Sequence, residues 1–401
     1  MIKLTLDNGI PLNLIKTKAE TIGFGFSVKI GSAFEEKEKR GISHFLEHML
    51  FKSNKRYKAE EINKTIELSG GKVNAFTDRD ITAFLFEVVP EGFEKALDIF
   101  YNMFINDKYK EDEFKTEKEV VKSEITIYES NPSYKIYDLA FKSLFGESDL
   151  GEPIVGTIET INNVEKEDLE EFKANYYTTD NIELFLVGNF KDKHINLIKN
   201  TFGKIEESKS KKKKEPTIKK GQDIVEKMET NNIFAILGFL KENKNNKFLN
   251  YLIHKKLISN GLSSLLFNEL REKEGFAYSI NLSIESFNIN GKQIFTPLLI
   301  FNGLNKDKKD IFVKRSLEVL NKKKFNKDYI EGRKKFFKLN ASHYDFNMFS
   351  LVENIVYYKT KGYPSILELK EEFLDKTPEE IRELVEKSSY DNYKLAMIEP
   401  K

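Results

Sequence analysis

The sequence predicts an α+β fold made of two similar domains, and three observations support this prediction. The chain has 401 residues, which exceeds the length that one hydrophobic core usually serves. A lysine-rich run divides the chain near its middle. The two halves on either side of this run begin and end with the same kinds of element in the same order, which indicates a duplicated unit.

The predicted linker covers residues 209–222, and its core runs from Lys211 to Lys214. A run of like charges repels itself and buries no apolar surface, so we expect an exposed connection between the domains. A basic binding tail is the alternative interpretation. The first domain is then predicted at residues 1–208 and the second at residues 223–401.

The matching elements can be read in order along the chain. In the first half, residues 1–6 alternate as in a strand, residues 22–30 form a strand-like run, and the half closes with a helix at 166–176 and an apolar strand at 182–187. In the second half, the strand-like run is 233–240. This half closes with a helix capped by Thr377 and begun by Pro378, and then with a strand at 393–398.

Composition excludes several classes of function. The 65 Lys and Arg residues nearly balance the 64 Asp and Glu residues, so no global field attracts nucleic acid or an anionic membrane. No stretch reaches the roughly 18 apolar residues of a membrane helix, and the N-terminus lacks the apolar run of a signal peptide. A cytoplasmic location is therefore expected. Without cysteine, any transition metal must be held by histidine and carboxylate.

The segment at residues 41–51 contains the pattern His44-x-x-Glu47-His48 with helical apolar spacing, and Ser43 could cap its start. Positions three and four apart share one face of a helix, so two imidazoles and a carboxylate would project together. Zinc accepts two such histidines, and Glu47 would lie beside a zinc-bound water as its base. Each histidine alone could be an ordinary surface or core residue, but this pattern is rarely met by chance in a chain with five histidines.

A third ligand must come from elsewhere in the chain. Residues 114–128 have helical character, and Glu117 and Glu124 lie seven positions apart on one face. Taken alone, this segment would be an ordinary charged helix.

Together these residues resemble the inverted-zincin peptidases of the pitrilysin, insulin-degrading enzyme and mitochondrial processing peptidase superfamily. The resemblance implies two homologous domains, each a mostly antiparallel β-sheet packed with α-helices. It also implies one zinc ion per chain, with His44, His48 and Glu124 as ligands, because Glu124 follows His48 by 76 positions as in the family. Glu117 matches the acidic residue that supports a ligand in these enzymes.

The resemblance extends to two further segments. Asn74, Ala75 and Phe76 match the strand with which family members pair an extended substrate, although a simple turn and strand would explain them as well. Arg271 and Tyr278 match a pair that orients the substrate and stabilises the oxyanion, although they could also be a surface charge and a core residue.

These expectations combine into one functional hypothesis. The chain is expected to be a zinc metalloendopeptidase that hydrolyses peptides or unfolded segments, with Glu47 activating a zinc-bound water. By resemblance, a homodimer would enclose a chamber, and Arg271 and Tyr278 would complete the partner's site. The alternative is a catalytically silent scaffold or binding subunit of the same superfamily.

Overall fold

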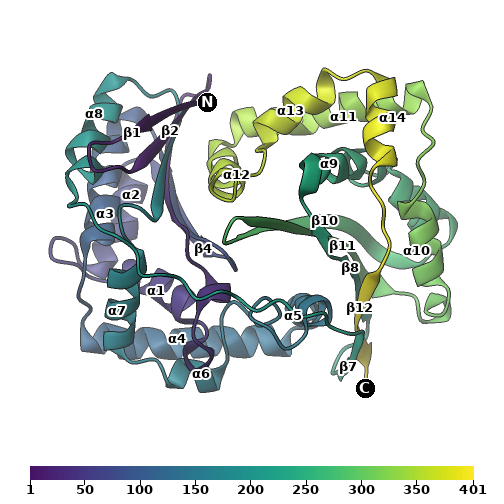
Figure 1. Cartoon of the computed structure of the whole chain (residues 1–401), viewed down its shortest axis with the longest axis horizontal. Helices are drawn as coiled ribbons and strands as arrows, with labels where there is room; N and C mark the ends of the chain where they lie inside the picture. Colours follow the sequence, from purple (N-terminus) through teal and green to yellow (C-terminus); the bar gives the residue numbers. More distant parts are fainter. The chain divides into compact units, whose positions relative to one another are not determined.

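A computed structural model describes the backbone of residues 1–401 and the side chains of residues 1–344 and 347–401. Over these residues the chain divides into two compact units, each with a β-sheet and packed helices (Figure 1). The first unit comprises Met1–Ile125, Pro153–Glu215 and Ser342–Lys361, and the second comprises Thr126–Glu152, Pro216–Ala341 and Gly362–Lys401. The predicted α+β fold is therefore confirmed.

The sheet of the first unit is mostly antiparallel. Its strands are β1 (Ile2–Thr5), β2 (Pro11–Lys16), β3 (Ile22–Val28), β4 (Gly71–Thr77), β5 (Thr82–Val88) and β6 (Ile182–Gly188). Their order is β1-β2-β6-β3-β5-β4, and β2 runs parallel to β6. The strand β4 therefore stands at one edge of this sheet, with β5 as its neighbour.

The sheet of the second unit repeats this plan. Its strands are β7 (Ile224–Met228), β8 (Ile233–Phe239), β9 (Lys241–Glu242), β10 (Ala277–Ile289), β11 (Lys292–Leu304) and β12 (Tyr393–Pro400). The order β10-β11-β8-β12-β7 matches β4-β5-β3-β6-β2, and β12 runs parallel to β7 as β6 does to β2. The duplication inferred from the order of elements in the two halves therefore extends to five strands of each sheet.

Helices pack on both sheets. Those of the first unit are α1 (Ile42–Leu50), α2 (Ala59–Leu68), α3 (Phe93–Ile105), most of α4 (Glu111–Ser130), α6 (Ile158–Asn162), α7 (Lys166–Tyr176), α8 (Asp192–Asn200) and α12 (Met348–Thr360). Those of the second are α5 (Pro132–Phe145), α9 (Lys247–Ile258), α10 (Phe312–Leu320), most of α11 (Lys327–Phe346), α13 (Ile366–Leu374), α14 (Pro378–Glu386) and the π-helical turn η6 (Phe267–Lys273). Thr377 caps α14 as predicted. Among the described residues, no helix is long and apolar enough to cross a membrane.

Strand β3 alternates glycine and phenylalanine, so its phenylalanine rings lie on one face of the sheet and its glycines on the other. The rings of Phe24 and Phe26 contact Phe100 of α3, with centroids 6.4 and 6.0 Å apart. On the opposite face, a Cβ atom at Gly23 would lie 2.1 Å from Val352 Cγ2 of α12. Helix α12, from the C-terminal half of the sequence, therefore packs directly on the glycine face of the first sheet.

The second unit contains the reciprocal arrangement. Helix α5 comes from the N-terminal half of the sequence and packs against β8 and β12. A Cβ atom at Gly238 would lie 2.8 Å from Leu144 Cδ1 of this helix. Each unit therefore combines most of one half of the sequence with one helix from the other half.

The lysine-rich run forms neither helix nor strand over residues 209–222, whose backbone is described in full. Part of it is anchored on the first unit, which differs from the fully exposed run that was expected. Lys214 Nζ donates to the carbonyl oxygen of Glu35 at 2.8 Å, and Lys213 Nζ donates to the carbonyl oxygen of Lys29. Lysine can bury its stem when backbone carbonyls accept from its ammonium. The boundaries of the linker stay a prediction.

Candidate metal centre

Helix α1 presents His44 and His48 on one face. Phe45, Leu46 and Met49 turn to the opposite side and are buried in the core of the first unit. The two imidazole rings lie with their centroids 4.6 Å apart. The two histidines, four positions apart, therefore share one face of the helix, as the sequence pattern predicted.

The start of α1 is capped by a side chain from outside the helix. Gly41 precedes the first helical residue with φ at 93°, a left-handed conformation that favours glycine. The buried Glu35 carboxylate accepts hydrogen bonds from the backbone N–H groups of Gly41 at 2.7 Å and Ser43 at 2.8 Å. The interpretation of Ser43 as the cap is therefore wrong, because Ser43 already lies inside the helix that Ile42 begins.

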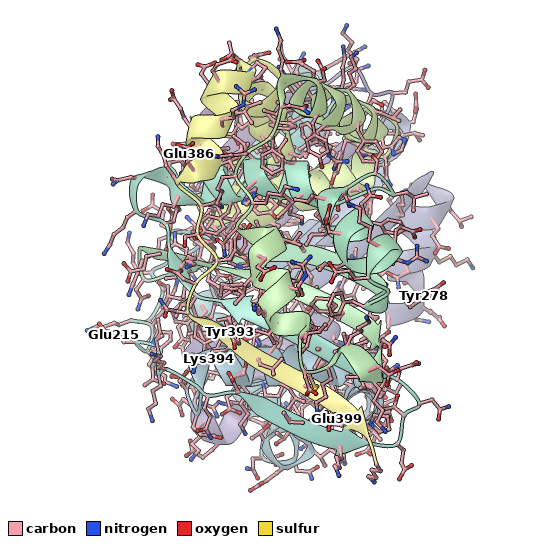
Figure 2. All side chains as sticks on the ribbon, turned by 90° about the vertical axis from the view of Figure 1, so that its right-hand side faces the viewer. Glu215, Tyr278, Glu386, Tyr393, Lys394 and Glu399 are labelled. Carbon is pink, nitrogen blue, oxygen red and sulfur yellow. The ribbon has the colours of Figure 1, made fainter. Side chains whose placement is uncertain are left out.

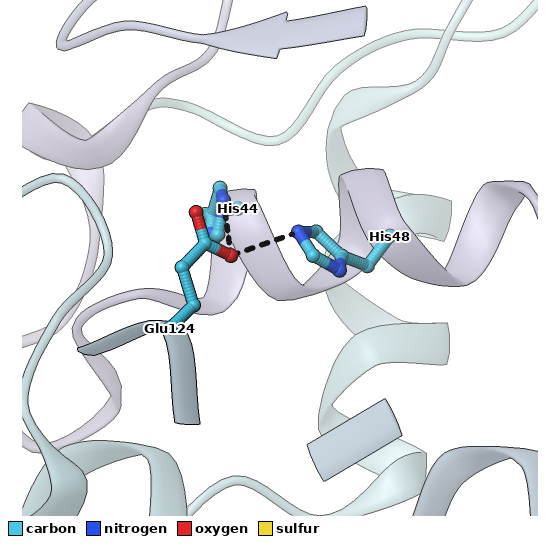
Figure 3. A group of neighbouring side chains, drawn as sticks. All are labelled: His44, His48 and Glu124. Atoms are coloured by element: carbon cyan, nitrogen blue, oxygen red, sulfur yellow. Dashed lines mark ion pairs between the residues drawn. The ribbon is translucent and has the colours of Figure 1, made fainter. Parts of the chain in front are cut away.

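Helix α4 brings Glu124 to the two histidines, as Figure 3 shows. One Glu124 oxygen lies 3.4 Å from His48 Nε2 and 3.7 Å from His44 Nε2. One ligand atom from each of the three residues can be chosen so that all lie within 4.8 Å of one another. Tetrahedral ligands at about 2.0 Å from a zinc ion are separated by about 3.3 Å. Two imidazole nitrogens and a carboxylate in this arrangement therefore fit zinc.

The end of α1 is fixed to α4 by further polar contacts. His48 Nδ1 lies 2.8 Å from one oxygen of the buried Glu117, and Lys52 Nζ forms an ion pair with the other oxygen. The backbone N–H of Ser53 donates to Glu113 at 3.1 Å. This role of Lys52 was not predicted from the sequence, although its position four residues after His48 places both on one helix face.

The environment separates the pKa values of the two histidines. Burial, and then the charge of His48, lower the pKa of His44 to about 4. Burial also lowers the pKa of His48, but hydrogen bonds with Glu117 and Glu124 outweigh it and raise the pKa to about 9. In the metal-free centre His44 is therefore neutral at pH 7, while His48 carries the proton that a metal ion would displace.

Glu47 lies beside the two histidines on α1, and its carboxyl is tuned to neutral pH. Burial raises its pKa to about 7, against the lowering effect of a hydrogen bond from Thr77. The Thr77 hydroxyl, at the end of β4, donates to Glu47 Oε2 at 2.5 Å. A group whose pKa lies near the working pH is suited to general base catalysis. No role was predicted for the Thr77 side chain from the sequence, although Thr77 directly follows Phe76 in the strand matched to substrate binding.

The predicted substrate strand is the edge strand β4. Because side chains alternate along a strand, Ala75 shares a face with Thr77, on the side of α1, while Asn74 and Phe76 point to the other face. There the ring of Phe76 lies 5.9 Å from that of Tyr357 in α12. Asn74 is exposed, and Ala75 and Phe76 are half-buried. An edge strand of this kind can add an extended peptide through backbone hydrogen bonds.

Arg271 and Tyr278 lie in the second unit, where the structure brings them together. Arg271 Nε donates to the carbonyl oxygen of Tyr278 at 2.9 Å, and its guanidinium stacks over the ring of Phe267 at 4.5 Å. The Tyr278 side chain is 80% exposed, and Figure 2 shows this residue at the surface of the unit. It belongs to β10, the strand that corresponds to β4 in the duplicated sheet.

Comparisons with known proteins agree with this fold and identify the family. Residues 14–158 match the family model described as "Insulinase (Peptidase family M16)", and residues 163–334 match "Peptidase M16 inactive domain". The Bacillus subtilis protein called "Uncharacterized zinc protease YmxG" is 33% identical over 294 residues, which are 73% of this chain and 72% of that protein. The beta subunit of the mitochondrial-processing peptidase of Dictyostelium discoideum is 32% identical over 185 residues, 46% of this chain and 39% of that subunit.

A solved structure with a similar fold is a protease from Helicobacter pylori. It has a TM-score of 0.84 and 23% sequence identity, and the match covers 100% of this chain and 99% of that one. The resemblance stated from the motifs is confirmed: the chain is a two-domain member of peptidase family M16.

Proposed function

We propose that this protein is a zinc-dependent endopeptidase that hydrolyses peptides or unfolded segments. The observation that carries the proposal is the convergence of His44, His48 and Glu124 beside the carboxylate of Glu47. Membership of a family whose relatives are called zinc proteases supports the same activity.

Three protein ligands leave a coordination position open, which is typical of a catalytic rather than a structural zinc site. A zinc ion bound by His44, His48 and Glu124, one per chain, would supply a Lewis acid that polarises the scissile carbonyl and lowers the pKa of water. Glu117 would hold His48 in the tautomer that leaves Nε2 free for the metal.

Glu47 would act as the general base. Its carboxylate would take a proton from the attacking water and later pass it to the leaving amine. Burial raises the pKa of this carboxyl above that of an ordinary glutamate, which favours proton uptake from the attacking water.

The substrate would bind as an added strand along β4, at Asn74, Ala75 and Phe76, so that backbone contacts rather than side chains dominate recognition. Tyr278 would donate to the oxyanion, and Arg271 would orient the peptide. Because Tyr278 is so exposed within its own unit, we infer a homodimer in which Arg271 and Tyr278 complete the partner's site in an enclosed chamber. The expected cytoplasmic location stays a prediction.

The decisive experiment compares cleavage of a quenched fluorescent peptide by the wild type and by Glu47→Gln, with zinc content measured for both. We expect Glu47→Gln to keep zinc and to lose about 10²- to 10⁴-fold in kcat. The exposed Glu119→Gln on α4 is the matched control and should cleave at the wild-type rate. A wild type that binds one zinc ion and cleaves no peptide would instead favour the scaffold function, for which the "inactive domain" match of residues 163–334 gives a reason.

The homodimer has its own test, which mixes two inactive variants. Glu47→Gln lacks the base, and Tyr278→Phe lacks the phenol. If the site is shared, random exchange of subunits places intact Glu47 and intact Tyr278 together in about a quarter of all sites, and activity returns to about that level. Continued inactivity of the mixture, with exchange verified by a label, would contradict a shared site.

A further inference from the structure

A buried ion cluster lies directly after the strand that carries Thr77. Lys361, which follows α12, places its Nζ 2.5 Å from Asp78 Oδ2 and 2.9 Å from Asp80 Oδ1. The Lys361 side chain is 0% exposed, and that of Asp80 is 1% exposed. All three residues belong to the first unit, although Lys361 comes from the C-terminal half of the sequence.

We propose that Thr77 is a positioning residue for Glu47, and that Lys361 holds Thr77 in place through its ion pair with Asp78. The inference rests on the proposed function of Glu47 as general base. It adds two residues, and one segment of the C-terminal half, to the machinery of the metal centre.

A general base needs a defined orientation of the Glu47 side chain. A glutamate side chain has three rotatable bonds, and a base must direct one oxygen at the water it activates. The Thr77 hydroxyl occupies Oε2 at 2.5 Å and leaves the other oxygen available for that task. Since Thr77 stands on the strand proposed to bind substrate, the same strand sets the direction of the base.

The turn that follows Thr77 contains Asp78 and Asp80. Asp78 accepts from the backbone N–H of Arg79 at 2.7 Å, and its own N–H donates to Ile81 at 2.8 Å. The buried carboxylate of Asp80 and the partly buried carboxylate of Asp78 repel each other in this short turn unless a cation is placed between them. Lys361 supplies that charge. Although burial lowers the pKa of Lys361, the charges of Asp78 and Asp80 outweigh this effect and raise it.

Helix α12 also contacts strand β4 itself. The ring of Tyr357 lies under the Lys361 ammonium, with Nζ 3.8 Å from the ring centroid, and it contacts Phe76 as well. The buried Ser27 hydroxyl of β3 forms a hydrogen bond of 2.7 Å with Thr360. The end of α12 is therefore fixed to the sheet at the point where Lys361 reaches the turn.

A direct test replaces Thr77. Thr77→Val keeps the shape and removes the hydroxyl donor, and Thr77→Ser restores it. We expect Thr77→Val to lower kcat at least about tenfold with KM changed less than about threefold and zinc content unchanged, because orientation rather than binding is lost. Thr77→Ser should recover most of the rate, which a purely structural role of the side chain would not explain.

The role of Lys361 requires a variant that folds. Lys361→Met alone would leave one more carboxylate than cation in this turn, because the buried Arg79 is the other cation beside Asp78. It is therefore combined with Asp80→Asn, which leaves Arg79 and Asp78 with no net charge. This double variant should bind zinc and show a reduced kcat. When it is combined with Thr77→Val, kcat should fall little further, because both changes act on the same hydrogen bond. Lys64→Met, at an exposed position of α2, controls for the loss of a lysine.

The outcomes separate this inference from the proposed function. If wild type cleaves, Glu47→Gln is inactive and Thr77→Val cleaves at the wild-type rate, the inference is wrong and the proposed function stands. Independent, multiplicative losses in the combined variant would overturn the link from Lys361 to Thr77. A wild type that binds zinc without cleaving any peptide would overturn both.

Discussion

His48 Nδ1 lies 2.8 Å from a carboxylate oxygen of Glu117, while Nε2 of the same ring faces Glu124 at 3.4 Å. One histidine therefore connects two glutamates that stand two turns apart on α4. The hydrogen bond at Nδ1 fixes both the tautomer and the rotation of the ring, and so decides which nitrogen is offered to the metal. Lys52 in turn holds Glu117 by an ion pair with its second oxygen.

Loss of the Glu117 carboxylate should weaken metal binding without abolishing it. We expect Glu117→Gln to lower zinc affinity by about 10- to 100-fold, because the ring loses its fixed orientation while all three ligands remain. Competition with a chromophoric chelator measures the affinity. Glu124→Gln should cost more, and Glu119→Gln should cost nothing. Equal affinities for Glu117→Gln and wild type would contradict this role.

Zinc binding should release about one proton per chain near pH 7.5. His48 is then protonated, because its pKa is about 9, whereas His44 is already neutral. The ion must displace the His48 proton, so the apparent affinity should rise with pH up to about 9 and then level off. Calorimetry in buffers of different ionisation enthalpy counts the protons. Binding without proton release would show that His48 is neutral in the metal-free protein.

The stability of the metal-free protein should depend on pH through Glu35. Burial outweighs the hydrogen bonds from Ser43 and Gly41 and raises the pKa of this carboxyl from 4.5 to about 7. The folded state therefore binds more protons than the unfolded state between these values. The contribution of Glu35 to the free energy of unfolding should fall by about 3 kcal/mol as the pH rises from about 4.5 to about 7, and this contribution should stay level above.

This dependence is measured by urea unfolding of wild type and Glu35→Gln across that pH interval. The variant carries no ionisable group at this position, so the difference between the two proteins isolates the contribution of Glu35. A difference that does not vary with pH would show that Glu35 keeps an ordinary pKa in the folded protein.

Packing of α12 on the first sheet predicts a destabilising change at Gly23. Gly23→Ala places a methyl group against Val352, and we expect a loss of about 1–3 kcal/mol in the free energy of unfolding. Val352→Ala should restore part of this loss in the double variant. Gly332→Ala in α11 is the control, because nothing lies within 4 Å of the added atom. It should stabilise the helix by about 0.5–1 kcal/mol. Full tolerance of Gly23→Ala would contradict the close contact.

Local sequence patterns determined much of this fold. The closing strands β6 and β12 and the helices α7 and α14 were all evident from apolar periodicity and from capping residues such as Thr377, because these signals act over a few neighbouring residues. The same is true of His44 and His48, since helical geometry alone places positions four apart on one face. Local sequence signals did not identify Glu124 as a ligand, because a glutamate on a charged helix is common. Only the resemblance to the family distinguished it from the other glutamates.

The tertiary structure decided the features that depend on distant parts of the chain. Sequence spacing did not predict that α12 packs on the first sheet or that Lys361 contacts Asp78, because each contact joins segments separated by long stretches of chain. It also did not predict Glu35 as the cap of α1, because the path of the turn between them is set by packing. The contacts of Lys213 with Lys29 and of Lys214 with Glu35 also join distant segments, so the sequence did not predict them. The sequence by itself determined which residues could form a zinc centre, whereas the packing of α1, α4, β4 and α12 decided which side chains surround it.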